Sequence, residues 1–373
     1  MLMKVSNSLA RSANGQQAEA LILRQVDKSY DGATKVVDAL DLDVHPGEFL
    51  TILGPSGSGK TSLLMMLAGF EQPSAGTIEI GGRDVSRLPP YKRNIGMVFQ
   101  HYALFPHLTV GENLAYPLQA RGWWKAEITE RVAWALQLIR LDGMKDRRPA
   151  QLSGGQQQRI AVARALIYNP QLVLMDEPLG ALDKQLREQM QDEIVRLHRE
   201  LRPTIVYVTH DQSEALSLSD RVAVFEAGRI AQIGTPSELY EEPRTAFVAG
   251  FIGENNRING TVIATDAEFC RVRCTDGASL DARNIASVGI GDKVNLAVRP
   301  ERLRPAQVTD GFSVEVEVAD ITYLGEVSRV RCRRLDGTEI IWKVPNCGQS
   351  TRPERGARIA LSFRREDARA FPA

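Results

Sequence analysis

The segment from Gly54 to Thr61 reads Gly-Pro-Ser-Gly-Ser-Gly-Lys-Thr and fits the pattern G-x-x-x-x-G-K-[ST]. Its glycines let the backbone turn tightly, so that successive N–H groups can bind phosphate oxygens where a helix begins. Lys60 would place its charge on the β- and γ-phosphates of a nucleotide, and the Thr61 hydroxyl would bind Mg²⁺. The predicted phosphate-binding residues are Gly54, Pro55, Ser56, Gly57, Ser58, Gly59, Lys60, Thr61 and Ser62. An apolar strand before the loop and an apolar helix after it, from Thr61 to Leu67, argue against a simple glycine-rich turn.

Two adjacent acidic residues follow a second apolar run. Leu172 to Met175 is continuously apolar, as is usual for a parallel strand buried on both faces, and Asp176 and Glu177 come directly after it. Ligands of parallel α/β sheets lie at the carboxyl ends of the strands. Asp176 is therefore placed to hold Mg²⁺ and Glu177 to polarise an attacking water. The alternative is a strand that ends in solvated charges before Pro178, and the phosphate-binding loop makes this alternative weaker.

Ser153, Gly154, Gly155 and Gln156 open a helix rich in Ala and Gln. Free N–H groups, the helix dipole and the Ser153 hydroxyl make this start a second anion-binding position. One nucleotide cannot easily reach both positions if they lie far apart on one subunit. Two subunits arranged head to tail would solve this, with each nucleotide between the Lys60 loop of one chain and the Ser153 loop of the other. The sequence therefore suggests a homodimer.

These residues need a larger framework to position them, and the chain divides near residue 251. Over 21–251, apolar strands such as Ile205 to Val208 alternate with helices, which favours an α/β fold with a parallel sheet. The stretch 102–166 is mostly helical, and we expect it to be an inserted helical lobe. Over 252–373, period-2 runs broken by Asp-Gly turns predict an all-β domain closed into a small barrel or sandwich. Similar segments in the same order suggest that this domain contains a duplicated unit.

Composition excludes several classes of protein. The 373 residues contain 46 Lys and Arg and 46 Asp and Glu, which indicates neither a strongly basic nucleic-acid binder nor an acidic disordered chain. No apolar run approaches the roughly 18 residues of a membrane helix. Residues 1–20 lack the apolar stretch of a secretory signal and are expected to form a flexible polar tail. Four cysteines without a CxxC pair suit a reducing cytoplasm, and we expect buried thiols in the β domain.

Leu152-Ser153-Gly154-Gly155-Gln156, beside the phosphate-binding loop and the strand before Asp176, resembles the signature of ABC transporter ATP-binding subunits. The resemblance covers nearly the whole chain after the tail. It implies an ABC-type P-loop NTPase domain that binds ATP with Mg²⁺ and hydrolyses it. It also implies the head-to-tail dimer that the two anion-binding positions suggest.

Further positions match motifs of this family one by one. Tyr30 matches the aromatic that stacks on adenine, with an ordinary surface tyrosine as the alternative. Gln100 matches the glutamine that senses Mg²⁺ and the γ-phosphate, and His210 the histidine that contacts the γ-phosphate. Asp183 in Gly180-Ala-Leu-Asp183 matches the family's D-loop and is equally suited to be a helix N-cap. The resemblance assigns catalysis to Glu177, His210, Gln100 and Lys60, nucleotide binding also to Tyr30, Ser153, Gly154, Gly155, Gln156 and Asp183, and metal binding to Thr61, Gln100 and Asp176.

One nucleotide-binding domain followed by a β domain is similar to the importer branch that serves solute-binding proteins, in which the C-terminal domain is an OB-like regulatory fold. Within this branch the chain most resembles spermidine/putrescine import ATPases, on Gln100 to His107 and Phe251 to Asn256. The resemblance implies two transmembrane permease subunits as partners, a solute-binding protein as an indirect partner, a peripheral location at the cytoplasmic face of the inner membrane, and no nucleic acid. Importers of iron(III), sulfate, phosphonate or sugars share these segments and stay open as alternatives. A soluble ABC ATPase of translation or DNA repair is the alternative from another class.

Two aromatic segments remain. His101 to His107 follows Gln100 and is the candidate groove for a helix of the permease, with plain packing between lobes as the alternative. Trp123 and Trp124 stand where relatives usually carry smaller residues, and we expect them to pack inside the protein rather than to contact a partner.

Overall fold

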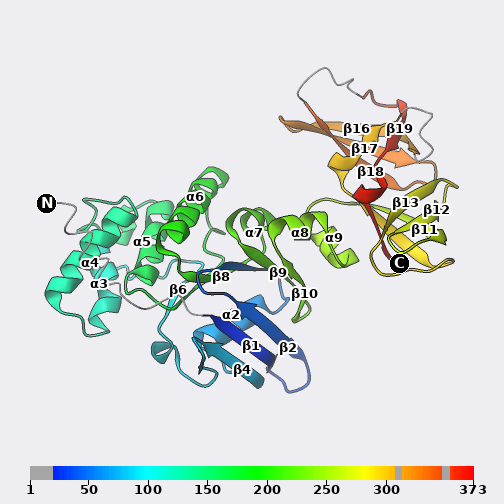
Figure 1. Cartoon of the computed structure of the whole chain (residues 1–373). Coiled ribbons are helices and arrows are strands. Elements are labelled where there is room, and N and C mark those ends of the chain that lie inside the picture. The colour runs from blue at the N-terminus through cyan, green and yellow to red at the C-terminus, as the bar shows by residue number, and fades with distance from the viewer. Residues whose placement is uncertain (1–19, 307–312, 347–352) are drawn as a thin grey trace. The chain divides into compact units, whose positions relative to one another are not determined.

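The computed structural model describes residues 20–306, 313–346 and 353–373. Apart from Ala20, the predicted tail at 1–20 lies outside the described residues. Contacts along the backbone divide the chain into two compact units, one ending at Ser237 and the other beginning at Glu238 (Figure 1). The domain boundary near residue 251 remains a prediction.

A six-stranded sheet with the order β10-β9-β3-β8-β7-β6 forms the centre of the first unit. Its strands are parallel except for β10, which pairs antiparallel with β9 at one edge. The strands are β3 Phe49–Leu53, β6 Ile95–Val98, β7 Leu172–Asp176, β8 Thr204–Thr209, β9 Arg221–Glu226 and β10 Arg229–Gly234. β3 and β8 are buried at every residue, as expected for parallel strands covered on both faces.

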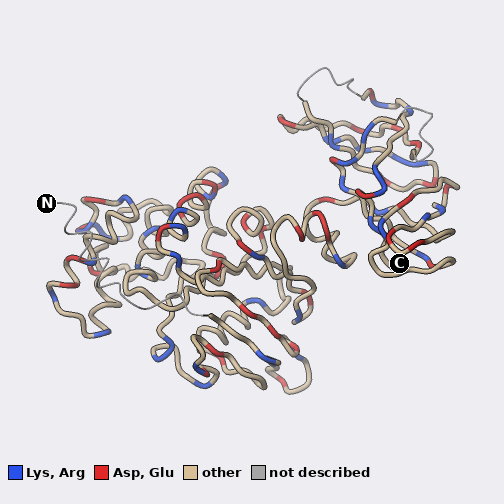
Figure 2. Tube along the Cα trace, in the orientation of Figure 1, with Lys and Arg blue, Asp and Glu red and all other residues tan. Residues whose placement is uncertain are grey.

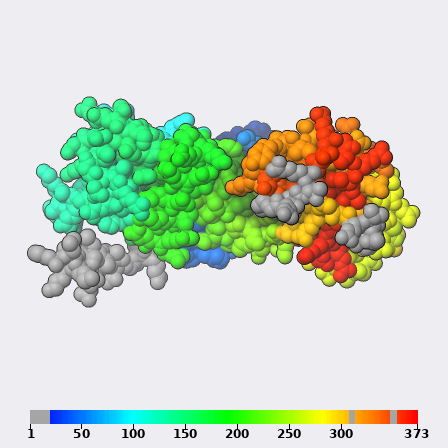
Figure 3. Space-filling model, turned by 90° about the horizontal axis from the view of Figure 1, so that it is seen from above, coloured from blue at the N-terminus to red at the C-terminus, as the bar shows by residue number. Residues whose placement is uncertain are grey.

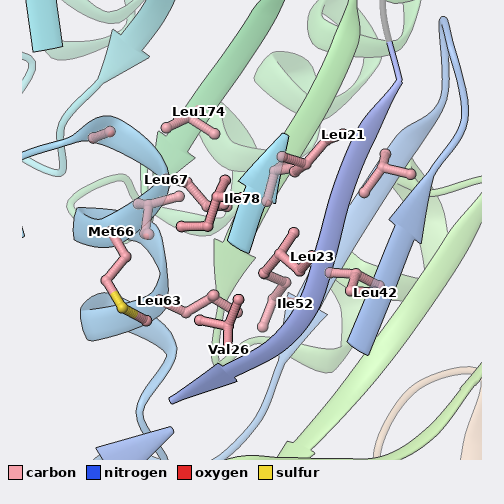
Figure 4. Packing of buried hydrophobic residues seen from close by; sticks show 14 of the residues in the cluster. Leu21, Leu23, Val26, Leu42, Ile52, Leu63, Met66, Leu67, Ile78 and Leu174 are labelled. Carbon is pink, nitrogen blue, oxygen red and sulfur yellow. The ribbon is translucent and has the colours of Figure 1, made fainter. Parts of the chain in front are cut away.

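A second sheet, with the order β2-β1-β4-β5, packs with helix α2 (Lys60–Ala68) onto the first. Its strands are β1 Leu21–Ser29, β2 Lys35–Val44, β4 Ala75–Ile80 and β5 Arg83–Asp84. Leu23 and Ile78 of this sheet, Leu63 of α2 and Ile52 of β3 belong to one buried apolar cluster (Figure 4). This cluster holds α2 between the two sheets and so fixes the position of Lys60 at its start.

The end of α2 is held by a buried arginine. The guanidinium of Arg93 donates hydrogen bonds to the carbonyl oxygens of Met66 (2.6 Å), Leu67 (2.9 Å) and Leu88 (2.8 Å). Burial lowers the pKa of Arg93 to about 10. Met66 and Leu67 lie in the last turn of α2, where the N–H of the C-cap Gly69 also donates to the Met66 carbonyl oxygen (3.2 Å), so Arg93 adds charged donors to this C-terminal cap.

Replacing Arg93 with methionine should lower the free energy of unfolding by about 2–4 kcal/mol, because the carbonyl groups of Met66, Leu67 and Leu88 each lose a charged donor. The measurement is urea unfolding of the full chain followed by circular dichroism. The matched control is Arg87→Met, which removes an exposed arginine of the same segment and should change stability by less than about 0.5 kcal/mol. Equal stability of the two variants would contradict the capping role.

Helices α3 (Val110–Gln119), α4 (Lys125–Leu138) and α5 (Gly154–Leu166) form the helical lobe around a shared apolar cluster. Residues 99–171 contain no strand, as predicted. Residues of α3 and α4 lie at one end of the first unit in the space-filling view (Figure 3). The expected packing of Trp124 is wrong: it is 78% exposed, at the N-cap position of α4, where its side chain does not face the helical core. Trp123 is partly exposed as well.

Helix α6 (Lys184–Leu201) begins after Asp183, whose carboxylate accepts a hydrogen bond from the Leu186 N–H (2.9 Å). The predicted N-cap is therefore confirmed, and Met190 and Ile194 of α6 are fully buried. Helix α7 (Gln212–Leu218) follows β8 after a single turn.

The second unit contains a closed five-stranded barrel and a five-stranded sheet. Helix α8 (Pro236–Glu241) begins just before the boundary between the units, and α9 (Ala246–Phe251) precedes the barrel. The barrel order is β11-β12-β13-β20-β14, with β11 Asn256–Thr265, β12 Phe269–Cys274, β13 Ser279–Asn284, β14 Lys293–Val298 and β20 Ala368–Pro372. The sheet order is β15-β19-β16-β17-β18, with β15 Arg304–Pro305, β16 Ser313–Tyr323, β17 Val327–Arg334, β18 Glu339–Pro345 and β19 Arg358–Ser362.

The barrel and the sheet share one apolar core, and polar side chains also connect the two. Asn256 of β11 exchanges two hydrogen bonds with the backbone of Ile341, and buried Arg334 pairs with Asp276.

The predicted buried thiols are confirmed for Cys270, Cys274 and Cys332, whereas Cys347 lies outside the described residues. Burial raises the pKa of Cys270 and Cys332 to about 11. Positive and negative residues are interspersed along this unit (Figure 2).

Candidate functional site

The predicted catalytic residues meet at the carboxyl ends of neighbouring parallel strands in the first unit. Leu53 at the end of β3 is in register with Thr209 at the end of β8, and Asp176 at the end of β7 is in register with Val208. Val98 at the end of β6 is in register with Met175. The loops that leave these strands therefore emerge at one edge of the sheet.

The loop between β3 and α2 wraps around the ammonium group of Lys60. Lys60 Nζ donates hydrogen bonds to the carbonyl oxygens of Gly54 and Pro55, both at 2.8 Å. Gly59 has φ +103°, and a Cβ at this position would lie 2.3 Å from the carbonyl oxygen of Val36, so the close approach requires glycine. Burial lowers the pKa of Lys60, and the charges of Glu177 and Asp176 oppose this shift.

Asp176, Glu177, His210 and Gln100 lie together beside this loop. Glu177 Oε1 is 2.9 Å from His210 Nδ1. A Cβ placed on Gly180 would lie 3.8 Å from Gln100 Nε2 and 4.0 Å from Glu177 Oε2, so both side chains reach the backbone of Gly180. Burial raises the pKa of Asp176, and the charge of Glu177 raises it further.

Glu177 also has an unusual backbone. Its φ is +42°, a left-handed value that non-glycine residues adopt rarely, and its N–H donates to the carbonyl oxygen of Val208 at 2.9 Å. Backbone strain of this kind is concentrated at functional sites, where the surrounding structure holds it in place. The turn directs the Glu177 carboxylate toward His210 rather than along the strand.

The donor set fits Mg²⁺ better than a softer metal. Asp176 contributes a carboxylate that is half-buried and next to a second acid, and Thr61 contributes a hydroxyl in the first turn of α2. Oxygen donors are the ligands that Mg²⁺ prefers, and this ion is usually held by one or two carboxylates together with substrate phosphates. In the described part of the chain, no group of three or more His, Cys, Asp or Glu residues could hold a metal ion by itself.

Tyr30 lies directly after β1 with its ring largely exposed. Its hydroxyl hydrogen-bonds to Ser62 Oγ at 3.2 Å, and Lys28 Nζ lies 4.7 Å from the ring centroid. The structure thus places the Tyr30 ring next to α2, close to the phosphate-binding loop.

Ser153 begins α5 with a reciprocal cap: Gln156 N–H donates to Ser153 Oγ (3.4 Å) and Ser153 N–H donates to Gln156 Oε1 (3.0 Å). A Cβ on Gly155 would lie 2.7 Å from Leu186 of α6, so this glycine permits close packing of the two helices. Among the described residues, no hydrogen bond or ion pair joins 153–156 to 54–62. In the part of the chain that the structure describes, these polar contacts therefore do not connect the start of α5 with the loop before α2.

The sequence analysis missed the polar residues that hold the backbone of the segment His101–His107. Asn113 is fully buried, and its side-chain amide accepts a hydrogen bond from the Phe105 N–H and donates one to the Phe105 carbonyl oxygen. Arg164 of α5 donates to the carbonyl oxygen of Tyr102 (3.0 Å). Tyr102 has φ +61°, and Arg164 also lies over the Phe105 ring. An asparagine inside an apolar helix pattern is the only signal that sequence offered for this support.

Comparison with known proteins agrees with this geometry. Residues 37–180 match the family described as ABC transporter, and residues 296–371 match the TOBE domain family. The chain is 45% identical over 346 residues to the spermidine/putrescine import ATP-binding protein PotA of Rubrobacter xylanophilus, covering 92% of this chain and 91% of that one. The protein of the same name from Thermobifida fusca is 42% identical over 369 residues, with 96% and 95% covered.

Solved structures define the class of protein. A dimeric structure of MJ0796, a bacterial ABC transporter cassette, is 32% identical with a TM-score of 0.52 and covers 58% of this chain and 98% of that chain. CbiO1 from Clostridium perfringens, part of the ABC transporter complex cbiONQ, is 28% identical with a TM-score of 0.56 and covers 60% and 90%. The first unit is therefore an ATP-binding cassette, and the predicted fold class is confirmed.

The chain belongs to the family of ABC transporter ATP-binding proteins. Members of this family bind and hydrolyse ATP. None of the helices within 20–306, 313–346 and 353–373 combines the length and apolarity needed to cross a membrane.

Proposed function

We propose that the protein is the ATP-hydrolysing subunit of an importer that moves spermidine and putrescine through a separate transmembrane permease. The observation that carries this proposal is the match to polyamine import ATP-binding proteins at 41–45% identity over most of both chains. The convergence of Lys60, Glu177 and His210 at the edge of one sheet supports ATP hydrolysis as its chemistry.

Binding of ATP is assigned to the loop 54–62 and to Tyr30. The backbone N–H groups of the loop and Lys60 would hold the phosphates, and the exposed Tyr30 ring would stack on adenine. Thr61 and Asp176, with Gln100 nearby, would hold Mg²⁺, which supplies positive charge beside the phosphates. Lys60 must exchange its bonds with the Gly54 and Pro55 carbonyl groups for bonds to phosphate oxygens.

Catalysis is assigned mainly to positioning and electrostatics. Glu177 would orient and polarise the attacking water, and His210, in contact with the Glu177 carboxylate, would reach the γ-phosphate. Lys60 would neutralise charge that develops on the phosphate. No covalent intermediate on the protein is required.

A second copy of the chain would complete the site. Ser153 is exposed at the start of α5 and Gly155 is buried in its first turn, and within the described residues no hydrogen bond or ion pair links 153–156 to 54–62. In a head-to-tail homodimer this start, with Gln156 and the Asp183 loop nearby, would face the ATP bound by the partner subunit. ATP would then close the dimer and hydrolysis would open it, which gives the subunit two states for driving transport.

Closing and opening of the dimer would drive conformational changes in two permease subunits. The chain would be bound peripherally at the cytoplasmic face of the membrane. We assign the contact to His101–His107, where Phe105 packs against the half-exposed Tyr116 ring at 4.7 Å between centroids. A solute-binding protein would act only through the permease. Residues 252–373 would form the regulatory domain and 21–251 the ATPase domain, and no nucleic acid is involved.

Deleting the gene in its source organism should reduce uptake of radiolabelled spermidine and putrescine to background, and the wild-type gene should restore it. A Glu177→Gln gene is the matched control and should not restore uptake. The tagged wild-type chain should also co-purify with two transmembrane proteins from solubilised membranes. If the deletion strain took up polyamines normally but no longer took up labelled sulfate or sugar, the assignment of polyamines as the solute would be refuted. If no membrane protein co-purified with the chain, the transport role would be refuted.

A further inference from the structure

A buried carboxylate lies behind His210. Glu214, in the first turn of α7, is only 2% exposed, and its Oε2 accepts hydrogen bonds from Tyr207 Oη at 2.8 Å and from Thr209 Oγ1 at 2.7 Å. Burial raises the pKa of Glu214, and the two hydrogen bonds oppose that rise. Such a group is costly to bury, and the proposed handling of ATP gives it no role.

The Thr209 hydroxyl ties the chain on both sides of His210. It donates to Glu214 and accepts a hydrogen bond from the N–H of Asp211 at 3.0 Å. Asp211 in turn caps α7 by accepting from the Ser213 N–H at 2.8 Å. The residues before and after His210 are thus both fixed to the start of α7. This restricts the backbone at His210 and therefore the positions that its imidazole can take.

Arg187 of α6 connects this cluster to the loop that ends in Asp183. Its guanidinium forms an ion pair with Asp211 (3.1 Å) and lies 3.9 Å from Glu214 Oε1. The same guanidinium donates to the carbonyl oxygen of Leu182 at 3.1 Å. Leu186, next to Arg187, lies 2.7 Å from where a Cβ on Gly155 would be, and Leu182 lies in ordinary contact with that position on Gly154 (3.6 Å), so this segment packs against the start of α5.

We propose that Glu214 is a positioning residue for ATP hydrolysis. Through Thr209 it fixes the backbone at His210, so that His210 Nδ1 stays 2.9 Å from Glu177 Oε1. Through Arg187 it ties this histidine to the loop 180–183 and hence to the part of the cassette that would face the partner subunit. The inference rests on the proposed function, because it assigns a role within that same site.

The test compares Thr209→Val, which removes the hydroxyl at nearly constant shape, with Thr209→Ser, which keeps it. In Thr209→Val, hydrogen–deuterium exchange of amides 209–214 without nucleotide should accelerate about tenfold, and kcat for ATP should fall about tenfold while KM changes less than about twofold. Thr209→Ser should restore both values. Glu214→Gln, which places an amide next to Arg187, should lower kcat in the same way, and Glu188→Gln on the exposed face of α6 should leave it unchanged.

Two results would overturn the positioning role. One is wild-type kcat and wild-type amide exchange in Thr209→Val. The other is slower turnover in Thr209→Val that Thr209→Ser shares equally, since the hydroxyl would then be irrelevant. If the wild-type chain hydrolyses no ATP, the proposed function fails instead, and the exchange measurement, which needs no nucleotide, still decides whether Thr209 fixes this segment.

Discussion

Replacing Glu177 with glutamine is expected to lower kcat for ATP at least about 100-fold while the affinity for ATP stays within about twofold of the wild type. The amide keeps the size of the side chain and a hydrogen-bonding group beside His210, but it cannot take a proton from water. The phosphate-binding groups of Lys60 and its loop are untouched.

The variant should therefore load nucleotide and stop before hydrolysis. ATP should then accumulate in closed dimers, seen as a shift to twice the mass in size-exclusion chromatography with ATP and Mg²⁺. ATP hydrolysis by coupled assay and ATP binding by calorimetry complete the measurement, with Glu188→Gln on α6 as the matched control. Hydrolysis at the wild-type rate by Glu177→Gln would show that another group activates the water.

Replacing Lys60 with alanine should impair ATP binding itself, whereas Glu177→Gln should leave ATP binding intact. The ammonium is a charge-assisted donor to phosphate, and its removal should weaken ATP affinity by about 100-fold or more. Calorimetric titration with ATP and Mg²⁺ measures this directly. Lys125→Ala at the exposed start of α4 removes the same charge elsewhere and should bind ATP normally.

Lys60→Ala also leaves the carbonyl groups of Gly54 and Pro55 without their donor, so its thermal unfolding has to be compared with that of the wild type. A folded variant that binds ATP with wild-type affinity would contradict the phosphate role of Lys60. The two variants together separate binding from turnover, because Lys60→Ala is expected to fail already at ATP binding, whereas Glu177→Gln should bind ATP normally and fail only at hydrolysis.

Local patterns predicted the first unit well. The phosphate-binding loop, the helix after it and the buried strand before Asp176 could be read from short segments, since each depends on neighbours in sequence. The N-cap of α6 at Asp183 is equally local. The rule that ligands lie at the carboxyl ends of parallel strands placed Glu177, whereas His210 was assigned through the family resemblance, and its contact with Glu177 appears only in the structure.

Features that depend on distant residues could not be predicted. The cap that Arg93 provides for α2, the Glu214 and Arg187 cluster, and the left-handed backbone of Glu177 arise from contacts between separate elements. The exposure of Trp124 was missed for a related reason: an aromatic pair indicates burial by residue type, and the polar neighbours Arg121 and Lys125 do not show which way the ring points. The separation of the β unit into a barrel and a sheet likewise depends on long-range strand pairing.

The place of β20 in the barrel has a consequence for biosynthesis. β20 pairs with β13 on one side and β14 on the other, yet all of β15 to β19 is translated between β14 and β20. On the ribosome, β11 to β14 therefore emerge as an open ribbon with two unsatisfied edges, and the ring closes only after the neighbouring sheet has been made. Every strand of the two sheets in the first unit precedes Pro236. The first unit is therefore able to fold while the second unit is still being synthesised.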